Sequence, residues 1–174
     1  MARHKSTIWP WVLVALWVCV IWGHSLMSGE DSSSESQFFT DLVRGAAVWL
    51  SSSEIPWLRS FIIRHPGIIN LLSNPERLHY IIRKVAHFSE YFVLGLLVLH
   101  AARRTLSNML SAVLTIALMW ACVPGIDETI QRFVPGRAGM FKDVLIDMGG
   151  FGTALAIGLP AIALSSMFAK GARH

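Results

Sequence analysis

DETIQRFVPGRAGMFKDVLID, residues 127–147, places seven charged side chains between two long apolar runs at residues 106–123 and 144–168. Residues 7–24 and 84–102 are two further runs of this kind. All four approach or reach the roughly 20 apolar residues that a helix needs to cross a membrane. The chain of 174 residues is 53% hydrophobic and 15% charged, with a mean hydropathy of +0.51. This composition is too apolar for an ordinary soluble domain, so we expect an all-α polytopic membrane protein with four transmembrane helices.

The basic residues predict how these spans are oriented. Short cytoplasmic segments of membrane proteins collect Lys and Arg. Three segments of this chain carry basic residues and no acidic ones, namely Arg3 and Lys5, Arg103 and Arg104, and Lys170 and Arg173. We therefore expect both termini to be cytoplasmic, with residues 25–83 and 127–142 outside. The basic residues are divided among membrane flanks and no RNA- or DNA-binding motif is present, so the net charge of +4 does not indicate a nucleic-acid partner.

The connection between the first and second spans is long enough to form helices of its own. From Phe38 to Leu50, apolar residues recur at i, i+3 and i+4, and a second such element begins at Trp57 and is broken at His65-Pro66-Gly67. We expect an extracytoplasmic helical insert over residues 37–72, either lying on the outer membrane surface or covering a ligand site. Asn74-Pro75-Glu76 then supplies an N-cap, a proline and an acid, which predicts a helix that starts near Pro75.

Polar residues inside the spans are expensive in lipid and should therefore face the interior of the bundle. On the second span, polar residues recur three and four positions apart, so they share one face of a helix. We expect helix breaks at Pro124-Gly125 and Pro135-Gly136, and further polar residues follow each break up to the start of the fourth span. If the topology holds, these groups meet at one level near the outer interface. We expect Arg137 to be the partner of Glu90. The predicted polar layer comprises Lys84, His87, Glu90, Tyr91, Asp127, Glu128, Gln131, Arg132, Arg137, Asp143 and Asp147.

The sequence resembles the VanZ-like family of small bacterial membrane proteins. Three stretches carry the resemblance: SLMSGEDSSSES after the first span, RKVAHFSEYFVLGLL, and DETIQRFVPGRAGMFKDVLIDMGG. The resemblance covers nearly the whole chain, although residues 37–76 carry little of it, and we treat residues 1–174 as a single domain. The resemblance implies a place in the bacterial cytoplasmic membrane and an association with resistance to the glycopeptide teicoplanin. It transfers a pattern of residues but no catalytic role.

Three functions fit this layer. The first is binding or modification of an anionic envelope lipid or a lipid-linked cell-wall precursor, with Lys84, Arg132 and Arg137 holding phosphate. The second is a metal-assisted hydrolase or transferase, in which His87 and nearby carboxylates bind a divalent ion. The third is a structural or partner-binding bundle whose charges only fix helix register. The sequence implies no cofactor beyond that optional metal, and it does not determine an oligomeric state.

Overall fold

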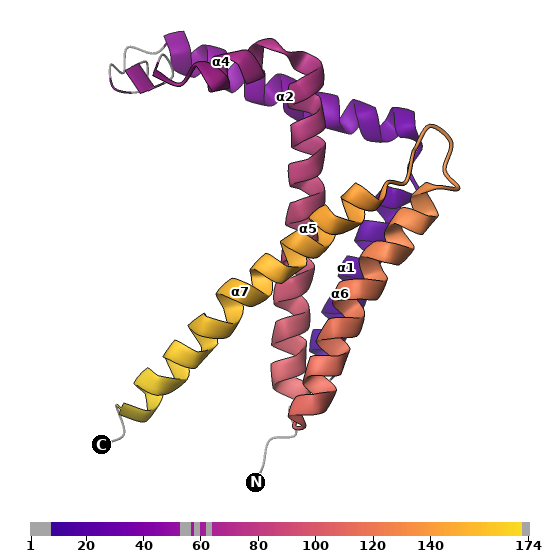
Figure 1. Ribbon diagram of the computed structural model, residues 1–174, viewed down its shortest axis with the longest axis vertical. Coiled ribbons are helices and arrows are strands. Elements are labelled where there is room, and N and C mark those ends of the chain that lie inside the picture. The colour runs from indigo at the N-terminus through magenta and orange to yellow at the C-terminus, as the bar shows by residue number, and fades with distance from the viewer. Residues whose placement is uncertain (1–7, 53–56, 58–59, 62–63, 172–174) are drawn as a thin grey trace. The chain divides into compact units, whose positions relative to one another are not determined.

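The protein is described by a computed structural model that covers residues 8–52, 57, 60–61 and 64–171. All regular secondary structure within these residues is α-helical (Figure 1). The predicted all-α fold is confirmed. In chain order the helices are α1 (Trp9–Ser25), α2 (Gly29–Ser52), α4 (Pro66–Ser73), α5 (Pro75–Thr105), α6 (Met109–Gln131) and α7 (Phe141–Gly171).

Short polar side chains cap the first turns of several helices. Asn74 Oδ1 accepts a hydrogen bond from the Arg77 amide at 3.1 Å, and α5 begins at Pro75 as predicted. Asn108 caps α6 in the same way, accepting from the Leu110 amide at 2.8 Å. Ser28 Oγ accepts from the Asp31 amide at the start of α2, at 3.1 Å. Each cap satisfies an amide that lacks a partner within its own helix.

The break predicted at Pro124-Gly125 is wrong. Helix α6 continues through Pro124 and ends at Gln131. Proline removes one amide donor and leaves the carbonyl four residues earlier without its usual partner, but the remaining turns of the helix can keep their hydrogen bonds. Uncoiling at this depth would leave several backbone groups without water to bind, so the continuous helix is favoured. As a result, Asp127, Glu128 and Gln131 lie on the last turns of α6 and not in a separate segment.

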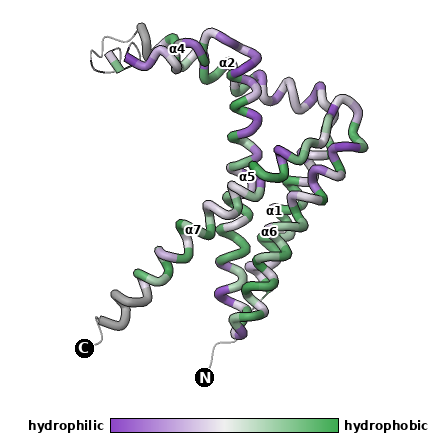
Figure 2. Tube along the Cα trace, in the orientation of Figure 1, coloured by the Kyte–Doolittle hydropathy of each residue, from purple (hydrophilic) through white to green (hydrophobic). Residues whose placement is uncertain are grey.

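Within the described residues, three helices are long and apolar enough to cross a membrane: α5, α6 and residues 141–165 of α7. Helix α1 has 17 residues, at the lower limit for crossing a membrane, and a fourth span is reached if α1 and α2 count together as one broken span. Figure 2 shows that apolar residues predominate along most of α6. Large apolar side chains lie exposed along α6, including Met109 at 82% and Leu118 at 62%, as expected for a surface that contacts lipid.

The described chain divides into two compact units, one of which consists of α1, the part of α5 from His87 onward, α6 and α7. Trp11 Nε1 donates to Thr105 Oγ1 at 2.9 Å, so the start of α1 lies beside the end of α5. Helix α6 packs against both α1 and α7. Buried apolar side chains from all four helices form the core of this unit: Val14, Ile21, Tyr91, Leu94, Val98, Ala101, Val123 and Phe151.

Glycine allows α7 to approach α5 closely. A Cβ atom added at Gly150 would collide with the backbone carbonyl of Phe88, and one at Gly95 would lie 2.8 Å from Ala154 Cβ. Small residues serve this purpose between helices in membranes. The adjacent Gly149 is different, because a Cβ there would meet only the Phe88 ring, at 3.9 Å.

The second unit, residues 28–86, contains α2, α4 and the first turns of α5. His79 Nε2 lies 3.2 Å from the Ser33 carbonyl oxygen and joins α5 to α2. Helix α2 begins at Gly29, earlier than the predicted start of the insert at residue 37, and α4 follows the predicted break at His65. Parts of residues 53–63 lie outside the described residues. Whether this insert covers a ligand site or lies on a membrane stays a prediction.

Candidate functional site

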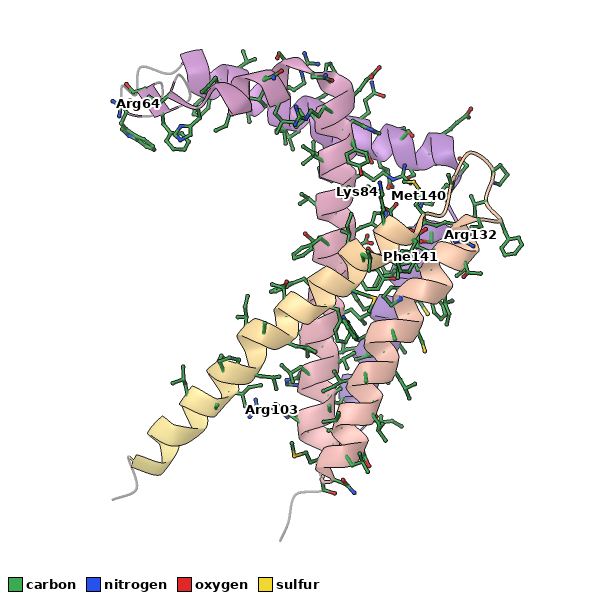
Figure 3. All side chains as sticks on the ribbon, in the orientation of Figure 1. Arg64, Lys84, Arg103, Arg132, Met140 and Phe141 are labelled. Atoms are coloured by element: carbon green, nitrogen blue, oxygen red, sulfur yellow. The ribbon has the colours of Figure 1, made fainter. Side chains whose placement is uncertain are left out.

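One end of the first unit gathers polar side chains that are connected by hydrogen bonds and close ionic contacts. They come from the end of α1, the middle of α5, the end of α6, the loop after α6 and the start of α7. Figure 3 labels the residues at the two sides of this loop, Arg132 on α6's end and Met140 and Phe141 at the start of α7. We call this group the polar cluster; it consists of His24, Ser25, His87, Glu90, Asp127, Gln131, Arg137 and Asp147.

Asp127 is the centre of a buried hydrogen-bond network. Ser25 Oγ donates to Asp127 Oδ1 at 2.5 Å, and Gln131 Nε2 lies 3.4 Å from Asp127 Oδ2 and 3.2 Å from Ser25 Oγ. All three side chains are at most 2% exposed. Gln131 reaches Asp127 because the two residues are one helical turn apart on α6. The network therefore fixes the orientation of the Asp127 carboxylate between α1 and α6.

Glu90 has a different partner from the one predicted. Its Oε1 lies 2.7 Å from His24 Nδ1, and this pair is partly open, with side-chain exposures of 20% and 51%. Arg137, the predicted partner, donates from Nη2 to the His24 backbone carbonyl at 2.9 Å. His24 thus connects the carboxylate of α5 to the guanidinium of the loop, and Arg137 lies at the edge of the polar cluster.

A tight turn directs Arg137 toward α1. The Arg137 amide donates to the Val134 carbonyl at 3.2 Å, and Gly136 has a positive φ of 76°. Pro135 and Gly136 occupy the central positions at which a type II turn favours proline and then glycine. The predicted break at Pro135-Gly136 is therefore present, and it sets the direction of the side chain that follows.

His87, Asp127 and Asp147 bring three potential metal-ligand atoms together from α5, α6 and α7. These atoms all lie within 4.8 Å of one another. His87 Nδ1 is 3.5 Å from Asp147 Oδ1, and Asp147 is fully buried. Neither Asp147 oxygen has a hydrogen-bond partner among the described residues. The arrangement leaves a carboxylate that is removed from water and poorly satisfied by protein.

Glu128 holds the loop instead of entering the cluster. Its Oε2 accepts from the Met140 amide at 2.7 Å. Gly139 packs directly on it, because an added Cβ would lie 2.5 Å from the Glu128 carbonyl oxygen. The α6–α7 connection is therefore pinned to the last turns of α6.

The remaining predicted site residues were not included in the polar cluster. Tyr91 is fully buried, with its ring in the apolar core and its hydroxyl beside Asp127, and Asp143 is 3% exposed in the first turn of α7. Arg132 is exposed at the end of α6. Lys84 belongs to the second unit, where its Nζ lies 5.0 Å above the Tyr80 ring.

Sequence reasoning missed His24 and Ser25. His24 ends the first apolar run and Ser25 follows it, at the level where the polar layer was expected. Their position at the end of a predicted span was the available signal. It was overlooked because the predicted layer was assembled only from residues 84–147, and the end of the first span was not included.

An all-helical chain with several membrane-length helices, exposed apolar faces and a buried polar cluster has the architecture of a multi-pass membrane protein. The chain belongs to the VanZ/LLP1 family, whose sequence model matches residues 10–163. This range contains every residue of the polar cluster. No curated protein and no solved structure matches the chain.

Proposed function

We propose that the polar cluster binds the anionic head group of an envelope lipid or of a lipid-linked cell-wall precursor, at the outer side of the bacterial cytoplasmic membrane. The observation that carries this proposal is the gathering of charged and hydrogen-bonding side chains from four helices at one end of a unit whose outer surface is apolar. A lipid presents a charged head group at that depth and an apolar tail beside it.

Arg137 is the residue we assign to the phosphate. A guanidinium can donate two parallel hydrogen bonds to a phosphate group. The Pro135-Gly136 turn brings Arg137 to the edge of the cluster, where His24 and Glu90 are partly exposed. A head group can approach there without unfolding the buried Asp127 network.

The placement of the basic residues supports a position of the polar cluster on the outer side of the membrane. Arg103 lies at the end of the first unit that is remote from Met140 and Phe141 (Figure 3). Because cytoplasmic flanks collect basic residues, the opposite end with the polar cluster would face outward. Resemblance to the VanZ-like family makes reduced susceptibility to teicoplanin the expected phenotype.

A purely structural bundle is the main alternative. In such a bundle the buried polar groups should satisfy one another, because each unsatisfied group costs about 1–3 kcal/mol. Here both oxygens of Asp147 in the polar cluster are buried without a hydrogen-bond partner among the described residues. Because these oxygens are acceptors, the deficit favours completion by a cation or by a hydrogen-bond donor such as a hydroxyl or amino group of a head group, whose phosphate would lie at Arg137.

The test compares Arg137→Ala, Glu90→Gln and Asp127→Asn with wild type at matched membrane levels. Co-purifying lipid is measured by mass spectrometry, and teicoplanin susceptibility is measured in the same strains. Arg132→Ala is the matched control, because Arg132 is an exposed arginine near the same loop.

We expect the three cluster variants to lose bound anionic lipid and Arg132→Ala to retain it. If folded cluster variants keep the wild-type lipid profile and phenotype, or if Arg132→Ala loses as much lipid as Arg137→Ala, the proposal is wrong. Retention of a lipid that is chemically unprocessed in the variants would instead favour an enzyme.

A further inference from the structure

We infer that His87, Asp127 and Asp147 form a binding site for one divalent transition-metal ion of the Zn²⁺ or Mn²⁺ type. The ligand atoms come from three different helices, α5, α6 and α7, and lie within 4.8 Å of one another. Ligand atoms about 2.0–2.2 Å from a common ion are separated by roughly 3–4 Å. Small side-chain rotations are therefore enough to bring all three onto one ion.

The independent sign of a ligand is the state of Asp147. This residue is completely buried, and neither of its carboxylate oxygens has a hydrogen-bond partner among the described residues. Asp147 faces His87, whose Nδ1 is 3.5 Å from Oδ1 and lacks a hydrogen-bond partner among the described residues as well. Burying a carboxylate without partners is costly, and a coordinated cation removes that cost.

Charge balance points to a divalent cation. Asp127 and Asp147 carry two negative charges when ionised, and neutral His87 adds a nitrogen ligand without charge. An ion of charge +2 neutralises this set. The donors also fit the chemistry of the ion, since imidazole with carboxylates suits Zn²⁺ or Mn²⁺, whereas Ca²⁺ and Mg²⁺ prefer sites made only of oxygen.

The surrounding hydrogen bonds position one of the ligands. Ser25 Oγ donates to Asp127 Oδ1 at 2.5 Å, and Gln131 Nε2 lies 3.4 Å from Oδ2. Such outer contacts hold ligating carboxylates in place, and their loss lowers metal affinity about 10–100-fold. Ser25 and Gln131 are thus positioning residues for the site.

The ion gives the acidic cluster a way to attract an anion. Three protein ligands leave coordination positions open, and a phosphate oxygen can occupy one of them while Arg137 holds another oxygen. This last step rests on the proposed recognition of a head group. The metal site itself does not, because the three side chains can bind the ion without a lipid.

The experiment measures metal binding to the full chain in lipid-free detergent after removal of metal with a chelator. Zn²⁺ is titrated by calorimetry, Mn²⁺ by electron paramagnetic resonance, and Mg²⁺ serves as the comparison ion. We expect wild type to bind one Zn²⁺ or Mn²⁺ per chain and to melt at a higher temperature with it. Asp147→Asn and His87→Gln should weaken binding by at least about 100-fold, and Ser25→Ala by about tenfold.

Glu128→Gln is the matched control, because it removes an equally buried carboxylate charge just outside the three ligands and keeps an acceptor for the Met140 amide. It should bind metal as wild type does. Absence of saturable binding by wild type overturns the inference even if a ligand variant fails to fold. If Glu128→Gln loses as much metal affinity as the ligand variants do, the inference is overturned as well. Metal binding without lipid binding would refute the proposed function alone, and lipid binding without metal would refute this site alone.

Discussion

Asp127 is a fully buried carboxylate whose hydrogen bonds come from two helices, Ser25 on α1 and Gln131 on α6. Removing the hydroxyl in Ser25→Ala leaves Oδ1 of Asp127 without its 2.5 Å donor. A buried polar group that loses its partner costs about 1–3 kcal/mol. We expect Ser25→Ala to lower the melting temperature of the metal-free protein in detergent.

Ser165→Ala is the comparison for that measurement. Ser165 is exposed, and its hydroxyl donates to the Ile162 carbonyl of its own helix at 2.8 Å. Removal of this hydroxyl should change the free energy of unfolding by no more than about 0.5 kcal/mol. Equal melting of Ser25→Ala and wild type would mean that the Asp127 network does not stabilise the bundle.

The His24–Glu90 pair belongs to a wetter environment and should contribute less. With side-chain exposures of 51% and 20%, it resembles a surface pair, for which about 0–1 kcal/mol is typical. We expect His24→Ala to destabilise the protein less than Ser25→Ala, as measured by detergent melting. A larger loss for His24→Ala would show that this pair, and not the Asp127 network, holds α1 to the bundle.

At the level of helices, the close approach of α7 to α5 depends on Gly150. A methyl group there would collide with the Phe88 carbonyl, so Gly150→Ala should force the helices apart and cost about 1–3 kcal/mol. At Gly149 the same change meets only the Phe88 ring at 3.9 Å, and alanine favours a helix over glycine by about 1 kcal/mol. The melting temperature should therefore fall in Gly150→Ala and rise in Gly149→Ala. An equal fall in melting temperature in both variants would contradict the close packing of α7 on α5 at Gly150.

The helices were predictable wherever a local rule decides the outcome. Asn74-Pro75-Glu76 indicated the start of α5, and Pro135-Gly136 indicated the turn before Arg137. Pro124 was misjudged as a break, because the sequence does not show that the rest of α6 keeps its backbone hydrogen bonds at that depth.

The membership of the site was only partly predictable. Spacing placed His87 and Glu90 on one face of α5, and the structure brings His87 together with Asp127 and Asp147. The pairing of Glu90 with His24 depends on how α1 is rotated in the bundle, which a single apolar run does not specify. Among the glycines of α7, Gly150 is tight whereas Gly149 and Gly152 make ordinary contacts, a difference that depends on how α7 faces its neighbours.

For the whole molecule, the unopposed basic residues predict that both termini and Arg103-Arg104 are cytoplasmic. A chain with Cys19 and Cys122 replaced by alanine provides the background for Ser107→Cys. An impermeant thiol reagent added to intact cells should leave this cysteine unlabelled and label it after permeabilisation. Labelling from outside in intact cells would reverse the topology and move the polar cluster to the cytoplasmic side.

The central claim is that the polar cluster is a head-group site and not a self-contained set of ion pairs. It is tested most directly by an experimental structure of the chain in a bilayer that contains anionic lipid. We predict density for a phosphate within about 3 Å of the Arg137 guanidinium. An ordered bilayer structure without a lipid phosphate at the Arg137 guanidinium, in which the Asp147 carboxylate is satisfied by protein or water alone, would contradict the account.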